Sequence, residues 1–328
     1  MKTKQAVCKN TLLSPLTALA RRLLWTTGKK TVSSVKMSLF QAFCDNNFRS
    51  RRGFVYMPAS NAASTQTVIP IFLACAQAIR TNHLIVRENR SDKEFHFQNW
   101  IRDRLTGTRF QYEAGGRNSY PDFRIVQMPE GFEVKGLAYP GREVNYDCNS
   151  QVPSGFHNGR TIYYIFGRYP SEPDGNAYPV LDFVLCHGDF LNADHNYVHK
   201  NKSVKGFGSY GDIMIRDRKM YVAPTPFGIA AGLAHTVTLI LPEGINPPSD
   251  QFKEVGRIVR TEAPHLIISY AFDLRTNSIS PQLLPNPSAG QEHKFRAWRL
   301  LEGSDDRVIL RARSSAVVVA DVEDLDDE

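Results

Sequence analysis

The sequence has few cysteines, and they are not arranged to bind zinc or to form a disulfide framework. Its five cysteines include no C-x-x-C pair, and an odd, irregularly spaced set is typical of reduced thiols in a reducing compartment. No run approaches the eighteen apolar residues of a membrane helix. The 42% apolar content is enough to bury a sizeable core. We therefore expect a soluble, cytoplasmic protein built around one large domain.

Acidic residues are missing from residues 1–44, which carry eight Lys and Arg, whereas residues 321–328 carry six acids and no base. We interpret residues 1–36 as a basic, dispensable extension that superficially resembles a transit peptide. The acidic tail is expected to be disordered. Between residues 45 and 320, 32 bases and 27 acids leave a net charge of +5. That balance is compatible with nucleic-acid binding but does not demand it.

Two carboxylates and a lysine lie on two short apolar segments, 120–126 and 132–136, joined by Met128-Pro129-Glu130-Gly131. Pro and Gly at these positions suit a type I turn, so we expect a β-hairpin. The hairpin register then places Asp122 opposite Leu137 and diagonal to Lys135. Asp122, Glu133 and Lys135 share one face, because side chains alternate along a strand. A one-residue slip would separate them.

These residue types suit metal-assisted phosphodiester chemistry. Mg²⁺ prefers oxygen ligands and usually binds one or two carboxylates together with substrate phosphate. Asp122 and Glu133 supply the carboxylates, and the Val134 carbonyl offers a third oxygen. Lys135 would orient the attacking water or stabilise developing negative charge. The alternative is an exposed hairpin with an ordinary Glu–Lys ion pair.

The run Pro121-Asp122…Glu133-Val134-Lys135 resembles the signature of the PD-(D/E)xK nuclease superfamily, and its surroundings resemble type II restriction endonucleases. A helix over 95–105 and a strand over 108–113 precede it. The loop 148–155 and two strand-like runs, 161–169 and 180–187, follow it. The family often has a helix between its third and fourth strands, yet residues 138–160 show no helical period.

The resemblance, which covers about residues 88–200, implies a bacterial or archaeal restriction enzyme that hydrolyses double-stranded DNA at a specific sequence. It implies 5′-phosphate and 3′-hydroxyl products, Mg²⁺ with Mn²⁺ as a substitute, and a homodimer. The family often places a further acid on the preceding helix, and Glu94 is the candidate. Ser91-x-x-Glu94 equally fits a capping box. Alternatives are a repair or structure-specific nuclease on the same core, or a DNA-binding protein without catalysis.

Two polar regions are candidates for DNA contacts. The loop after the catalytic strand offers amides and guanidinium groups suited to bases and phosphates: Arg142, Asn145, Asn149, Gln151, Asn158 and Arg160. A predicted hairpin over 212–222 is preceded by a lysine and offers further cations: Lys205, Arg216, Arg218 and Lys219. The alternatives are turn-building residues in the loop and a solvated hairpin tip.

The glycines at 206–211 form a G-x-G-x-x-G run that leads into this hairpin rather than a helix, so no nucleotide cofactor is expected. A zinc or HNH site around His195 and His199 lacks the cysteines and the hairpin it would need.

The expected fold is α/β (α+β), with a restriction-endonuclease-like mixed β-sheet flanked by helices. A single nuclease domain is expected over 37–320, with its catalytic core at about 88–200. The β-rich C-terminal region 201–320 is either a subdomain or a continuation of the sheet. One buried helix is predicted over 71–81, with Pro70 in its first turn.

Overall fold

The computed structural model describes residues 65–87, 95–115, 119–149, 151–193, 209–217, 220–273, 275–276 and 278–301. They all belong to one compact unit, Ser60–Glu328, and Met1–Ala59 form another. The predicted extension 1–36 and the acidic tail 321–328 lie outside the described residues.

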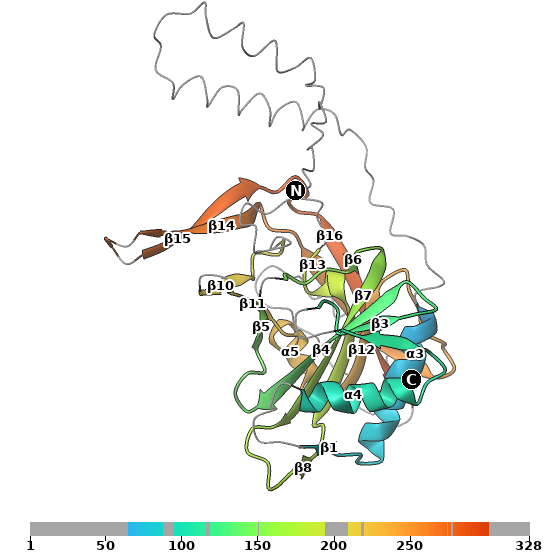
Figure 1. Cartoon of the computed structure of the whole chain (residues 1–328). Coiled ribbons are helices and arrows are strands. Elements are labelled where there is room, and N and C mark those ends of the chain that lie inside the picture. Colours follow the sequence, from blue (N-terminus) through green and yellow to red (C-terminus); the bar gives the residue numbers. More distant parts are fainter. Residues whose placement is uncertain are drawn as a thin grey trace, which may run out of the picture. The chain divides into compact units, whose positions relative to one another are not determined.

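A nine-stranded mixed sheet organises the described residues and confirms the predicted α/β class (Figure 1). Its order is β13-β16-β12-β9-β7-β4-β3-β2, with β6 paired to β7. The pairs β4·β7 and β9·β12 are parallel, and the others are antiparallel. The strands are β2 Tyr112–Ala114, β3 Phe123–Ile125, β4 Glu130–Tyr139, β6 Phe156–His157, β7 Arg160–Pro170, β9 Asp182–His187, β12 Val237–Pro242, β13 Phe252–Thr261 and β16 Glu292–Leu300. Three strands after residue 200 therefore continue the same sheet.

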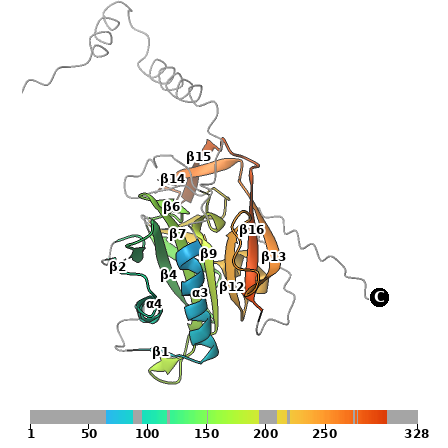
Figure 2. The same ribbon diagram turned by 90° about the vertical axis from the view of Figure 1, so that its right-hand side faces the viewer.

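Two helices, α3 (Thr65–Arg80) and α4 (His96–Thr106), pack their apolar residues on one face of this sheet. Figure 2 shows α3 running along the sheet. The predicted boundary of α3 was wrong, because the helix begins at Thr65 and contains Pro70. The proline is tolerated because the carbonyl that loses its partner belongs to exposed Gln66, where water replaces the hydrogen bond.

Helix α4 is seated on two glycines that are neighbours in the β4·β7 pair, Gly136 and Gly167. A Cβ atom on Gly167 would lie 2.2 Å from the ring of Phe97, and one on Gly136 would lie 2.8 Å from the Phe97 Cβ atom. The missing side chains therefore let α4 approach the sheet closely.

The other face of the sheet is covered by a three-stranded sheet of order β10-β11-β5 and by the short helix α5 (Pro226–Ile229). Its strands are β5 Asn145–Asn149, β10 Met214–Asp217 and β11 Met220–Pro224. The antiparallel β10·β11 pair confirms the hairpin predicted over 212–222. Residues between β4 and β7 form β5 and β6 where the family often has a helix, in line with the missing helical period.

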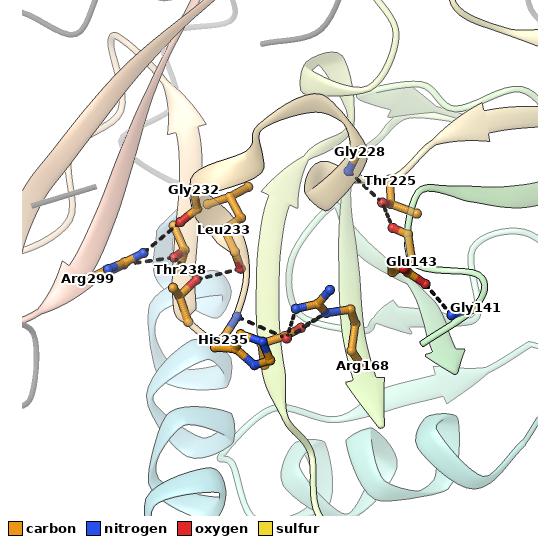
Figure 3. A network of polar contacts seen from close by, with 12 residues as sticks. Gly141, Glu143, Arg168, Thr225, Gly228, Gly232, Leu233, His235, Thr238 and Arg299 are labelled. Carbon is orange, nitrogen blue, oxygen red and sulfur yellow. Dashed lines mark hydrogen bonds and ion pairs between the residues drawn. The ribbon is translucent and has the colours of Figure 1, made fainter. Parts of the chain in front are cut away.

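A buried ion pair joins the end of β7 to this second layer (Figure 3). Arg168 donates from Nε to both Asp182 oxygens, at 2.8 and 2.7 Å. Its guanidinium lies 4.3 Å from the ring centre of Tyr139 and 4.5 Å from that of Phe227 in α5. The backbone N–H of His235 also donates to Asp182, at 3.3 Å. One buried cation therefore holds the sheet, α5 and the start of β12 together.

The same close-up shows how α5 is capped, since Thr225 accepts from the Gly228 N–H at 3.1 Å and donates to the Glu143 carbonyl (Figure 3).

Two smaller pairs complete the described strands. β1 (Ile85–Val86) pairs with β8 (Ala177–Tyr178). β14 (His265–Asp273) and β15 (Ser278–Pro285) form a separate antiparallel ribbon that leaves the nine-stranded sheet (Figure 1). The 3-10 helices η1 (Gly188–Phe190) and η2 (Ala231–Leu233) end two connections.

Candidate active site

The strands β3 and β4 pair as predicted, but the predicted turn and register were wrong. β4 begins at Glu130, so the connection is residues 126–129 rather than Met128–Gly131. In the observed register Phe123 opposes Phe132 and Arg124 opposes Gly131. The predicted register is thus displaced by four residues along β4.

Contacts outside the hairpin explain this difference. The Glu130 side chain is buried and accepts a hydrogen bond from the Thr67 hydroxyl of α3, which fixes residue 130 in the strand. Arg160 Nη1 donates to the carbonyls of Ile125 and Met128 at 2.8 and 3.0 Å. Its guanidinium therefore holds the turn, and turn preferences alone do not decide the register.

The displacement keeps the predicted common face and brings the carboxylates closer. Because it is an even number of residues, Asp122, Glu133 and Lys135 still point to one side of the sheet. Extending the observed register by one residue places Asp122 directly opposite Glu133, at the distance of a cross-strand pair. Their face is the one covered by β5 and β11, away from α3 and α4.

Three hydrogen bonds join the trio. The Asp122 backbone N–H donates to Glu133 Oε2 at 3.2 Å, and the Val134 N–H donates to Asp122 Oδ2 at 2.8 Å. Lys135 Nζ donates to Glu133 Oε1 at 2.6 Å. In a strand the N–H and C=O of one residue point to the same edge. The Val134 carbonyl therefore points toward the edge on which Asp122 lies.

The electrostatics of the site favour a bound cation. Burial, followed by the charge of Glu133, raises the pKa of Asp122 to about 7, although Lys135 and the Val134 N–H oppose the rise. Burial alone would lower the pKa of Lys135, but the charges of Glu133 and Asp122 outweigh it and the net direction is upward. Two carboxylates that repel each other beside one ammonium group have room for further positive charge.

The donor set fits a hard divalent cation. Within the described ranges, no group of three or more His, Cys, Asp or Glu side chains is arranged to hold a metal. Asp122 and Glu133 provide two carboxylates, and the Val134 carbonyl adds an oxygen from the same edge. Mg²⁺ needs no more from a protein, because it keeps several waters and takes substrate oxygens. Glu94, the predicted fourth acid, lies outside the described residues.

Three tyrosines that the sequence interpretation did not assign to the site stand around the trio. Tyr164 is the β7 neighbour of Glu133, and its hydroxyl lies 2.9 Å from that of Tyr120. The ring centre of Tyr146 lies 6.0 Å from Lys135 Nζ. The Tyr-rich run 161–169 was a signal for this wall, but it was interpreted only as a strand.

The predicted DNA-contact loop is divided between exposed and structural residues. The Arg142 side chain is 70% exposed and lies 3.4 Å from Asp147. Gln151 donates to the Val152 carbonyl at 2.9 Å. Asn158, with a φ of 48°, occupies the turn between β6 and β7. Arg160 is committed to the turn before β4, so among these side chains Arg142 is the one placed to meet a ligand.

The structure brings the two predicted DNA-contact regions side by side. β11 pairs with β10 on one edge and with β5 on the other. Asn145 lies opposite Pro224 at one end of the β5·β11 pair, and Asn149 lies opposite Tyr221 at the other. Arg216 lies on the outer strand β10. Several predicted residues lie outside the described part of the chain: Lys205, Arg218 and Lys219, together with His195 and His199.

Comparisons with protein-family models, with curated proteins and with solved structures found no match to this chain. Among the helices that the described residues form, none is both long and apolar enough to cross a membrane.

Proposed function

We propose that this protein is a Mg²⁺-dependent, sequence-specific endonuclease of the PD-(D/E)xK type that hydrolyses double-stranded DNA, with the character of a type II restriction enzyme. The observation that carries the proposal is the cross-strand placement of Asp122 and Glu133 with Lys135 on the same face. The products would be a 5′-phosphate and a 3′-hydroxyl.

Each member of the trio has a distinct role in this proposal. A bound Mg²⁺, or Mn²⁺ on the same oxygen ligands, would neutralise charge developing on the scissile phosphate and activate water. Asp122 and Glu133, with the Val134 carbonyl, would hold the cation. Lys135, kept charged by Glu133, would orient the attacking water and stabilise the extra negative charge on the phosphate.

The small sheet β10-β11-β5 is the proposed DNA-reading element. It packs over the catalytic face, with Tyr146 and Cys148 of β5 in the same core as Tyr164 of β7. Arg142 precedes β5 at the surface, and Arg216 lies on β10. A β-ribbon of this size can enter the major groove, where arginine reads guanine and amides read adenine.

Plasmid digestion with purified protein and Mg²⁺ tests the proposal. We expect discrete fragments, and we expect Asp122→Ala and Lys135→Ala each to reduce the cleavage rate by at least about a hundredfold. Asp250→Ala and Lys294→Ala, which change exposed residues of the same types, serve as matched controls and should cleave normally.

The same experiment separates the alternative functions. Cleavage of branched or damaged duplex without site preference would indicate a repair or structure-specific nuclease. Tight duplex binding without cleavage in any divalent metal would indicate a non-catalytic DNA-binding protein. Metal-dependent cleavage that survives both Asp122→Ala and Lys135→Ala would mean that the proposed site is wrong.

A further inference from the structure

The ribbon formed by β14 and β15 has the composition of a protein-binding arm rather than a DNA-binding one. Residues 265–285 contain one acid, Asp273, and one base, Arg275, among mostly apolar and small polar residues. Leu283 and Leu284 are 47% and 42% exposed, and consecutive strand residues face opposite sides. Each side of the ribbon therefore carries an exposed leucine and little charge for phosphates.

The base of the ribbon is fixed by a buried polar network. Asn286 Nδ2 donates to Glu262 Oε2 at 2.8 Å and to the Ala263 carbonyl at 3.0 Å, and its N–H donates to the Pro264 carbonyl at 2.8 Å. Glu262 also lies 2.8 Å from His293 Nε2 of β16. Glu262 and Asn286 are both buried. An arm mounted this firmly loses little freedom when it binds a partner.

The two strands of the ribbon differ in their ability to pair further. β15 contains Pro281, opposite Tyr270, and ends at Pro285, opposite His265. Proline supplies no N–H and is confined to edge strands. β14 has no proline and is rich in β-branched and aromatic residues, which favour strands. In the described part of the chain β14 pairs with β15 alone, so its outer edge presents backbone groups that suit another strand.

We propose that the outer edge of β14 pairs antiparallel with the same edge of a second copy of this chain, so that two ribbons form one four-stranded sheet. A two-fold axis makes such a contact self-complementary. The inference deepens the proposed function and rests on it for the reason why two copies are needed, since cutting both strands of a symmetric site takes two active sites. The nine-residue edge spans roughly 30 Å, less than a large obligate interface needs. A reversible dimer follows.

Sedimentation of the full chain over a micromolar concentration range tests the arm without any cleavage assay. The disruptive variant is Ser269→Lys with Ala271→Lys on β14, which places like charges across the two-fold axis. The matched control is Gln282→Lys with Ser280→Lys, at the directly opposed positions of β15. We expect a wild-type dimer, a dissociation constant raised about tenfold or more by the β14 lysines, and little change with the β15 lysines.

A wild-type chain that stays monomeric at the highest concentration would overturn the proposal. Equal weakening by both lysine pairs would overturn the assignment of the β14 edge. The cleavage assay adds an independent outcome: the β14 variant should nick supercoiled plasmid where wild type linearises it. If wild type dimerises through β14 but never cleaves, the proposed function fails and the arm stands.

Discussion

Replacing Asp122 by Asn should stabilise the metal-free protein while abolishing its Mg²⁺ response. Burial and the charge of Glu133 raise the pKa of Asp122 to about 7, about three pH units above an ordinary Asp. The folded protein therefore holds this proton more tightly than the unfolded chain does. The corresponding stability is present at low pH and is lost as pH rises through about 7.

The magnitude follows from that difference. Three pH units correspond to about 4 kcal/mol at full effect, and the partial exposure of Asp122 reduces this to about 2 kcal/mol. Asn cannot ionise, and its side-chain oxygen can still accept from the Val134 N–H. At pH 8.5 in EDTA, Asp122→Asn should thus be more stable than wild type by about 2 kcal/mol. At pH 4.5 the gain should shrink to about 0.5 kcal/mol.

Urea unfolding at the two pH values, with and without Mg²⁺, measures this directly. Millimolar Mg²⁺ at pH 8.5 should stabilise wild type by mass action and leave Asp122→Asn unchanged. A variant that is less stable than wild type at pH 8.5, or a gain that does not depend on pH, would refute the reasoning. Asp250→Asn, at an exposed position, is the control and should show neither effect.

Two further predictions concern the scaffold. Gly167→Ala should destabilise the fold by about 1–3 kcal/mol, because the new Cβ meets the Phe97 ring at 2.2 Å; Gly244→Ala, with nothing within 4 Å, is the control in thermal unfolding, and equal effects would contradict the account of α4. Asp182→Asn should cost about 3–5 kcal/mol, because it leaves the buried Arg168 cation uncompensated; a cost below 1 kcal/mol in urea unfolding would contradict it.

Much of the core fold could be predicted because its signals are local. The apolar run of 161–169 gives the buried strand β7, and the helical period after Phe95 gives α4. The hairpin over 212–222 is also a local pattern. Sheet order could not be predicted in the same way. Whether residues after 200 join the first sheet depends on pairings such as β9·β12, whose partners are more than fifty residues apart.

The site shows the same division at closer range. Alternation along two strands is enough to put Asp122, Glu133 and Lys135 on one face, and any even displacement preserves that result. Their spacing is not local. It required the observed register, which moves Asp122 from a diagonal to a directly opposed position. The tyrosine wall was invisible for a similar reason, because Tyr120, Tyr146 and Tyr164 come from three separate segments.

The geometry of the carboxylate pair is therefore set by residues that have no part in metal chemistry. Thr67 holds Glu130 at the first position of β4, and Arg160 holds the turn before it. Together they fix which residue of β4 faces Asp122. A slip of one residue would turn Asp122 away from Glu133 altogether, since side chains alternate. The cost of such a slip includes a buried carboxylate left without its hydrogen bond and three carbonyls that lose a guanidinium donor. Stability of the turn and assembly of the candidate metal site are thus one structural problem, solved by contacts from α3 and β7.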